Sequence, residues 1–334
     1  MTAIAPGKLI LCGEHAVVYN APAIALAVNR YATATVERHT ASRVGFNLLN
    51  IHYHKDHTVK ALKTLKRQLL KNYDAFQQGQ KSIKDVLKLP MELTQFAITN
   101  LLDKLNHTLT EGLQLKTHSD IPMGCGMGSS AASILVATRA MADHLRIELS
   151  EDLYLRYSLE AENLQHGQSS GLDLKVCYRG GCVFFHNHEW EALPPPTFPL
   201  YMVNTGVPES STGECVSHVK SRMKDHVLEE FSQVAFSLKD ALLQNDESQF
   251  KEAIKKNHDL LVDLELVPSP IQAFIRTLEA QGFAAKICGA GTCRGNSAGM
   301  MLIAGPEDPQ SLCKDYGFQS ELIECDTKGL RTLS

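Results

Sequence analysis

Three glycines alternate with other residues in one short run of the chain, and this run constrains the local fold more than any other feature. The run Pro122–Gly128 (PMGCGMG) is followed at once by two serines and an alanine-rich segment. Because glycine has no Cβ, this backbone can adopt positive φ and approach a ligand closely. The alanine-rich segment predicts a buried helix over 131–145. A helix N-terminus offers unpaired N–H groups and its positive dipole end, so the run predicts an anion-binding loop.

Other glycine-rich phosphate loops have different patterns. The chain contains no G-x-x-x-x-G-K-[ST], and position 129 is serine, which excludes G-x-G-x-x-G. Ser129 and Ser130 can cap the helix, and a hydroxyl at this point can also ligate Mg2+. Taken alone, the run leaves a second interpretation open, which is a glycine-rich turn with an ordinary serine cap.

Size and composition exclude several classes of protein. The chain has 334 residues, enough for one large domain or two ordinary ones, and a net charge of -4 without a long basic stripe. We therefore expect no nucleic-acid partner. No apolar stretch approaches about 18 residues, so we expect no membrane span. Nine cysteines without a C-x-x-C pair, and an N-terminus unlike a signal peptide, predict a cytoplasmic protein with reduced thiols.

The clearest break in composition is the proline run Pro194–Pro196, which suggests a domain boundary near 186–198. Beyond it, hydrophobic patterns predict a strand at 201–204, helices at 214–243, 247–262 and 270–281, strands at 284–288 and 300–304, a helix at 308–316 and a strand at 319–325. This order is typical of a split βαβ, ferredoxin-like unit. We therefore expect an α+β chain with two domains, 1–190 and 191–334.

Two further runs add ionisable side chains to this pattern. Near the N-terminus, Lys8, Glu14 and His15 lie within eight residues of one another among small apolar neighbours. Later, Glu162 lies near the end of a predicted helix and Asp173 lies in the serine- and glycine-rich segment that follows. One of these two carboxylates could hold a metal ion and the other could orient a nucleophile.

These runs, in this order, resemble the motifs of the GHMP kinases. The sequence shows the APGK…GEHAVV start, the P-x-G-x-G-x-G-S-S-A-A loop and a late K-x-x-G-A-G turn at Lys286–Gly291. The H-G-x-x-S-G-x-D run at His166–Asp173 and the HAVVY sequence at His15–Tyr19 are most similar to the mevalonate kinase branch of that superfamily.

The resemblance implies a fold and an activity. The expected fold has an N-terminal, nucleotide-binding domain of the ribosomal protein S5 domain 2 type, a ferredoxin-like C-terminal domain and a site in the cleft between them. The expected activity is the ATP- and Mg2+-dependent phosphorylation of the primary hydroxyl of mevalonate, a step in isoprenoid precursor synthesis by the mevalonate pathway. The resemblance also suggests a homodimer.

The resemblance also implies residue roles. Asp173 matches the base or orienting group for the attacking hydroxyl, with Lys8 beside it. A lysine ammonium lowers the pKa of a nearby carboxylate and stabilises charge on an attacking oxygen. Ser130 and Glu162 match the Mg2+ ligands. The nucleotide-binding positions are Pro122, Gly124, Gly126, Gly128, Ser129, Ser130, Gly289 and Gly291, and the acceptor-pocket positions are Glu14, His15 and Thr205.

Two departures from the family pattern leave alternatives open. Thr292, Cys293 and Arg294 stand where the family usually continues with glycines. Gly206 and Glu209 follow Thr205 where basic residues are common in the family. The alternatives are a kinase of this type acting on another small alcohol, and a non-catalytic protein of the same fold that binds a metabolite.

Two histidine clusters lie outside these motifs, His52/His54/His57 and His186/His188. Alternate histidines on a strand share one face and could bind zinc. Neither cluster has a convincing set of further ligands nearby in the sequence. We interpret both as parts of solvated strands or hairpins.

Overall fold

The computed structural model describes residues 1–187 and 189–333, and within them the chain forms two sheets. The eight strands of the first sheet are β1 (Thr2–Cys12), β2 (Ala23–His39), β3 (Val44–Leu48), β4 (Tyr53–His57), β5 (Gly112–Ser119), β6 (Cys182–His186), β7 (Glu189–Leu193) and β12 (Arg331–Leu333). Their order is β12-β1-β2-β5-β3-β4, with β6 paired to β2 and β7. The long strand β2 can join so many partners because β6 pairs with its first residues and β5 with its last.

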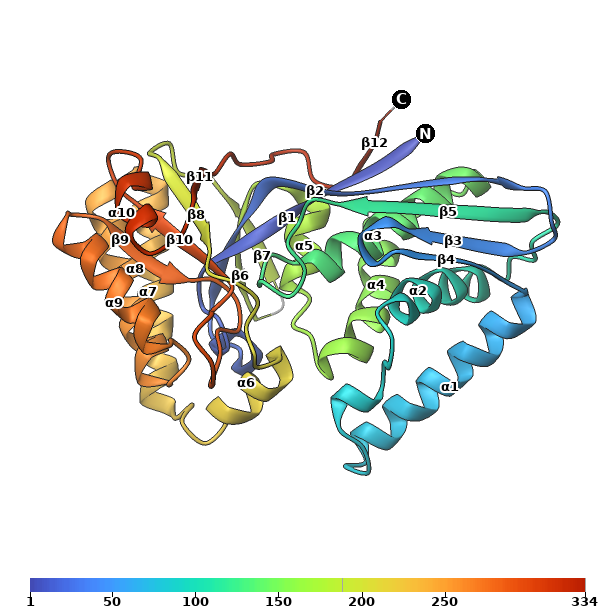
Figure 1. The fold of residues 1–334 in the computed structure, drawn as a ribbon, viewed down its shortest axis with the longest axis horizontal. Helices are drawn as coiled ribbons and strands as arrows, with labels where there is room; N and C mark the ends of the chain where they lie inside the picture. Colours follow the sequence, from blue (N-terminus) through green and yellow to red (C-terminus); the bar gives the residue numbers. More distant parts are fainter. Residues whose placement is uncertain (188, 334) are drawn as a thin grey trace.

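The helices of this half cover the sheet (Figure 1). They are α1 (Val59–Gln77), α2 (Met91–Lys104), α3 (Ser129–Leu145), α4 (Glu151–His166) and α5 (Leu172–Arg179), with short 3-10 turns η1 (Ala16–Tyr19), η2 (Leu49–Ile51) and η3 (Ile83–Asp85). Helix α3 packs directly on β1 and β2, and its alanines 131, 132 and 137 are fully buried. Small side chains allow this close approach, so the predicted buried helix is confirmed.

The second sheet has the order β11-β8-β10-β9, and all of its pairs are antiparallel. Its strands are β8 (Leu200–Asn204), β9 (Ala284–Ile287), β10 (Met300–Ala304) and β11 (Ser320–Leu322), and its helices are α6 (Thr212–Val219), α7 (Asp225–Gln244), α8 (Glu247–Asp263), α9 (Ser269–Ala280) and α10 (Gln310–Asp315). This order is the ferredoxin-like arrangement that the sequence predicts. The expected helix 214–243 is two helices, and the last expected strand is shorter.

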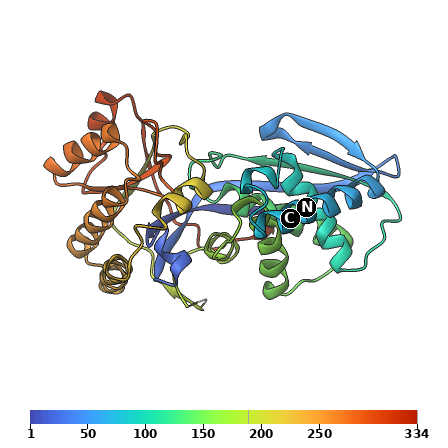
Figure 2. The same cartoon turned by 90° about the horizontal axis from the view of Figure 1, so that it is seen from below.

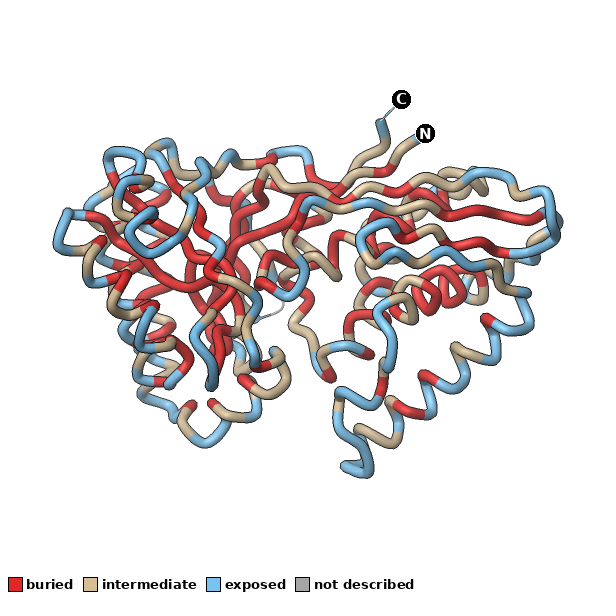
Figure 3. The backbone as a smooth tube through the Cα atoms, in the orientation of Figure 1, coloured by how far each residue is buried: buried red, intermediate tan, exposed pale blue. Residues whose placement is uncertain are grey.

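The two halves lie side by side along the long axis of the molecule (Figure 2), and buried segments run from one sheet towards the other (Figure 3). The end of the chain returns to the first half, because β12 pairs with β1. Asp326 fixes this return by accepting hydrogen bonds from the Gly329 N–H at 2.7 Å and the Tyr31 hydroxyl at 3.0 Å. The division into domains at 190/191 stays a prediction.

Neither histidine cluster forms a metal site in the described part of the chain. His54 is exposed, whereas the His57 ring nitrogen lies 2.7 Å from the Tyr53 hydroxyl. His188 lies outside the described residues. Within 1–187 and 189–333, no group of three or more histidine, cysteine or acidic side chains could hold a metal ion. No helix in these same ranges is long and apolar enough to cross a membrane.

Candidate active site

Lys8 and Asp173 form an ion pair at the wall of a cavity. Lys8 lies on β1 and Asp173 in the first turn of α5, and the Lys8 Nζ is 3.0 Å from the Asp173 Oδ1. The lysine side chain is only 3% exposed, whereas the aspartate is 30% exposed and faces a cavity. Residues more than 160 positions apart thus meet because α5 packs against β1.

The glycine-rich loop lies against this lysine. Gly124, Gly126 and Gly128 have φ of 73°, 85° and 71°, which confirms that the loop uses the positive φ that glycine allows. A Cβ on Gly128 would lie 3.0 Å from the Lys8 Cγ, and the Lys8 N–H donates to the Met127 carbonyl at 2.9 Å. The loop is therefore held against β1 through its contacts with Lys8.

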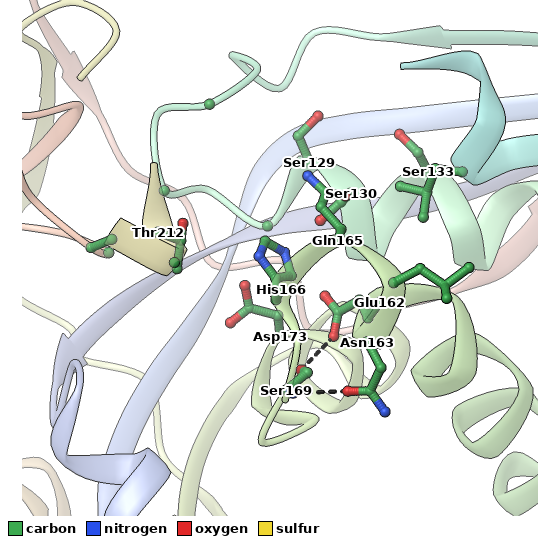
Figure 4. Close-up of a pocket in the computed structure, with 18 of the residues that line it drawn as sticks. Ser129, Ser130, Ser133, Glu162, Asn163, Gln165, His166, Ser169, Asp173 and Thr212 are labelled. Carbon is green, nitrogen blue, oxygen red and sulfur yellow. Dashed lines mark hydrogen bonds between the residues drawn. The ribbon is translucent and has the colours of Figure 1, made fainter. Parts of the chain in front are cut away.

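The N-terminus of α3 is open. Its N-cap is Gly128, and among the described residues no side chain caps this helix. The interpretation of the loop as a turn with an ordinary serine cap is therefore wrong. Ser129 and Ser130 instead line the cavity, and Figure 4 shows Ser130 facing the space above Glu162 and Asp173. Free N–H groups beside two hydroxyls suit an anion and its counter-ion.

Glu162 is a buried acid with one neutral partner. It lies on α4, is 1% exposed, and its Oε2 accepts a hydrogen bond of 2.7 Å from the Ser169 hydroxyl (Figure 4). Burial, and next the nearby Asp173 carboxylate, raise its pKa to about 8, while Ser169 and Lys8 act in the opposite direction. The Ser169 N–H also donates to the Asn163 Oδ1 at 2.8 Å, which holds the segment between α4 and α5 in place.

The sequence assigned no role to Ser169 or His166, although both lie within the H-G-x-x-S-G-x-D run. His166 ends α4 and lines the same cavity, and burial lowers its pKa. His166 is a fixed position of this run, whereas Ser169 stands at a variable one, so the pattern gave a signal for His166 alone. The contact of Ser169 with Glu162 needs the turn between the two helices, which the pattern does not describe.

One cavity of about 1470 Å³ collects most of the predicted site residues. Its walls come from both halves of the chain, because α6 and the turn after β9 face the glycine-rich loop and the α4–α5 segment. The predicted residues that line it are Lys8, Glu14, His15, Pro122, Gly124, Gly126, Gly128, Ser129, Ser130, Glu162, Asp173 and Gly289. Thr205 and Gly291 are not among its lining residues.

Thr205 and Gly291 instead have packing roles. The Thr205 hydroxyl donates to the Gly299 carbonyl at 2.8 Å and accepts from the Ala298 N–H at 3.0 Å, so it fixes the start of β10. A Cβ on Gly291 would lie 2.5 Å from the Leu266 carbonyl oxygen, inside the C-terminal half. The structure therefore does not bring either residue to the cavity.

The backbone at Gly289 contacts the backbone of the glycine-rich loop at Gly126. A Cβ on Gly126 would lie 2.5 Å from the Cys288 carbonyl oxygen, and one on Gly289 would lie 2.8 Å from the Gly126 Cα. The two backbones are thus in direct contact. The Met300 N–H donates to the Cys125 carbonyl at 3.0 Å beside this contact.

Arg294, one of the residues that replace the family's later glycines, forms an ion pair with α6. Arg294 and Lys84 approach the same carboxylate, with Arg294 Nη2 at 3.0 Å and Lys84 Nζ at 2.8 Å from the Glu214 Oε1. Lys84, from η3, belongs to the first half of the chain. These exposed ion pairs therefore link the two halves of the chain at the edge of the cavity. The Lys84 ammonium, and then Ser211, hold the pKa of Glu214 far below its usual range.

His15 lies in a strained turn at the wall of the cavity. Its φ is 62° with ψ of -45°, and the Ala16 N–H donates to the Glu14 carbonyl at 2.7 Å, which makes a γ-turn of the rare positive-φ kind. Such a conformation costs about 1–3 kcal/mol and needs support from its surroundings. The His15 Nε2 lies 3.0 Å from the Ala290 carbonyl oxygen, and burial lowers the pKa of the ring to about 4.

Comparison with known proteins gives the family. Residues 92–181 match the GHMP kinases N terminal domain, and residues 238–293 match the GHMP kinases C terminal model. The mevalonate kinase of Pyrococcus furiosus is 30% identical over 303 residues, which cover 86% of each chain. The chain belongs to the mevalonate kinase family.

Two more distant mevalonate kinases extend this result. The Bos taurus mevalonate kinase is 26% identical over 339 residues, with 90% of this chain and 85% of that one covered. The crystal structure of the Methanococcus jannaschii mevalonate kinase superposes with a TM-score of 0.81 at 23% identity and covers 98% of both chains. The whole two-sheet architecture is thus the mevalonate kinase fold.

The contact between Gly126 and Gly289 predicts an unequal response of two glycines with the same φ. Gly126 and Gly282 both have φ of 85°, but only Gly126 has backbone within reach of an added Cβ. We expect Gly282→Ala to cost about 1–2 kcal/mol for the positive φ alone. Gly126→Ala should cost a further 1–3 kcal/mol or so because the two turns must separate. Urea unfolding of both variants measures the difference, and equal losses would contradict the contact.

The buried Glu162 predicts a pH dependence of the metal-free protein. The folded chain holds a proton on this carboxyl up to about pH 8, whereas the unfolded chain releases it near 4.5. Stability from this group is therefore fully present below about pH 4.5 and is lost as the pH rises through about 8. Glu162→Gln should remove this loss in chemical denaturation series, whereas the exposed control Glu148→Gln should keep it. If the free energy of unfolding of Glu162→Gln fell with pH as steeply as that of the wild type, Glu162 would not be the group responsible.

Proposed function

We propose that this chain transfers the γ-phosphoryl group of ATP to the primary hydroxyl of mevalonate, giving 5-phosphomevalonate. The observation that carries the proposal is the Lys8–Asp173 pair beneath an open helix N-terminus. Membership in the mevalonate kinase family supports the choice of substrate. A protein that only binds a metabolite has no need of a paired lysine and aspartate beside a phosphate-binding loop.

In this proposal Asp173 orients the acceptor hydroxyl and receives its proton. Lys8 holds the carboxylate in place and stabilises the negative charge that develops on the attacking oxygen. The 30% exposure of Asp173 leaves room for the hydroxyl, while the buried Lys8 ammonium cannot leave the pair. Most of the catalysis is positioning and electrostatics, as in other phosphoryl transfers.

The glycine-rich loop and the first turn of α3 would hold the triphosphate. Ser130 and Glu162 would hold Mg2+, which neutralises phosphate charge when bound. The donor set fits the ion, because a hydroxyl and a carboxylate are oxygen ligands. Burial and the nearby Asp173 raise the pKa of Glu162 and so favour its neutral form, and a bound divalent ion would favour the ionised carboxylate instead. Pro122 and Gly289 would shape and support this end of the site.

The compartment and assembly are also part of the proposal. All nine cysteines are free thiols, which supports a reducing cytoplasmic setting. The homodimer that the resemblance implies stays a prediction.

A panel of acceptors tests the function. We expect ATP-dependent ADP release with mevalonate, and little or none with phosphomevalonate or galactose. Because Gly206 and Glu209 replace basic residues of the family, another small hydroxy compound belongs in the panel. Turnover of that compound alone would change the substrate, and ATP binding without turnover of any acceptor would favour a binding protein.

Asp173→Asn tests the role of the carboxylate. We expect turnover to fall about 100- to 10,000-fold, because a positioned general base is lost. The affinity for ATP should change little, since the loop and α3 are untouched. Steady-state kinetics and nucleotide titration measure the two effects, with the exposed Asp152→Asn as the control. Wild-type turnover in Asp173→Asn would remove Asp173 from the mechanism.

A further inference from the structure

A buried polar cluster joins the first and third sequence motifs. Glu14, which is 1% exposed, forms an ion pair with Lys286 through its Oε1 and accepts a hydrogen bond of 3.2 Å from the Asn257 Nδ2 at its Oε2. Lys286 and Asn257 are both fully buried. Both oxygens of the Glu14 carboxylate are thus used by residues from β9 and α8, in the other half of the chain.

The same two residues also bind the backbone around Glu14. The Asn257 Oδ1 accepts a hydrogen bond of 3.3 Å from the Gly13 N–H, and the Lys286 Nζ donates to the Ile10 carbonyl at 3.1 Å. Burial lowers the pKa of Lys286, but the Glu14 carboxylate and the nearby Cys288 raise it, and because the net shift is upward the ammonium stays charged. A buried pair of this kind is held in one geometry, because separating it would leave an uncompensated charge.

The turn that this cluster holds is the strained one. His15 follows Glu14 directly, and its positive φ places the ring against the Ala290 carbonyl. Burial keeps the imidazole neutral, so the Nε2 that faces this carbonyl carries the proton. The Nδ1 is then an acceptor, and it has no hydrogen-bond partner among the described residues. The position of this ring depends on a turn fixed from the opposite half of the chain.

We propose that Asn257 and Lys286 are positioning residues that act through Glu14 to set the Gly13–His15 turn and thereby the acceptor end of the site. Neither of the two lines the cavity. Glu14 lines the cavity, but both of its carboxylate oxygens are engaged by these two residues, so it is a positioning residue as well. This inference rests on the proposed function for its kinetic test, but not for its structural one.

The first experiment uses Asn257→Ala with a matched control. Asn100 is also a buried asparagine, on α2, and its amide donates to the Glu160 carboxylate at 2.9 Å away from the turn. We expect Asn257→Ala to raise the KM for the acceptor about 10-fold or more, since a buried hydrogen bond to a charged group is lost. The Kd of ATP, from nucleotide titration, should change less than about 2-fold. Asn100→Ala should lower only the melting temperature.

A double-mutant cycle with His15→Ala shows whether the effect passes through the ring. We expect Asn257→Ala to add little to the acceptor KM once His15 is alanine, because non-additivity marks coupled residues. Full additivity would overturn the proposal, as would an unchanged acceptor KM in Asn257→Ala. Lys286→Met should raise the acceptor KM in the same way as Asn257→Ala. If Lys286→Met does not fold, the charge-neutral Glu14→Gln/Lys286→Met variant takes its place, with the same expected rise in acceptor KM. Wild-type kinetics in that variant would also contradict the proposal.

An NMR measurement separates this inference from the proposed function. With ¹⁵N-labelled histidine, the His15 ring signal is assigned by its loss in His15→Ala. We expect this signal to shift in Asn257→Ala and to stay in place in Asn100→Ala. If the wild type phosphorylates no acceptor, the proposed function fails. The NMR spectrum alone then decides whether Asn257 positions His15. An unshifted His15 signal in Asn257→Ala would then overturn the positioning role.

Discussion

The glycine-rich loop is confined on two sides, and the rest of the site depends on this confinement. The Lys8 side chain lies under Gly128, and the Gly289 turn touches Gly126 from behind. Only backbone without a Cβ fits between them, so the loop keeps one shape and leaves the N–H groups of α3 open. The first contact comes from β1 and the second from the turn after β9. The shape of the loop therefore depends on how the two halves of the chain pack together.

Three acids at the site differ because their partners differ. Glu14 is buried and fully paired with Lys286 and Asn257, so it holds structure together. Asp173 has Lys8 as its partner and remains partly exposed to the cavity. Glu162 is buried, its one hydrogen bond among the described residues comes from the Ser169 hydroxyl, and its pKa rises. The same functional group thus has three roles: Glu14 holds structure together, Asp173 is the proposed base and Glu162 is the proposed metal ligand.

The residues with the strongest chemical signal were predictable from the sequence. Alternating glycines, the Lys8 run and the segment ending at Asp173 all line one cavity, and the ferredoxin-like order of the second sheet is as expected. Thr205 and Gly291 were placed at the site by resemblance, yet both support neighbouring backbone. A motif records that a residue type is needed at a position. It does not record whether a ligand or the protein itself needs it.

The sequence by itself determined which local elements form, because periodicity, glycine positions and helix-forming residues act over short distances. It also determined the family, through three motifs in order. Only the tertiary structure decided which residues meet across the chain, such as Glu14 with Lys286 and Asn257, and Arg294 with Glu214. Those contacts depend on how the two sheets pack. That packing is a collective result of buried area and matched charge, which no single run of residues contains.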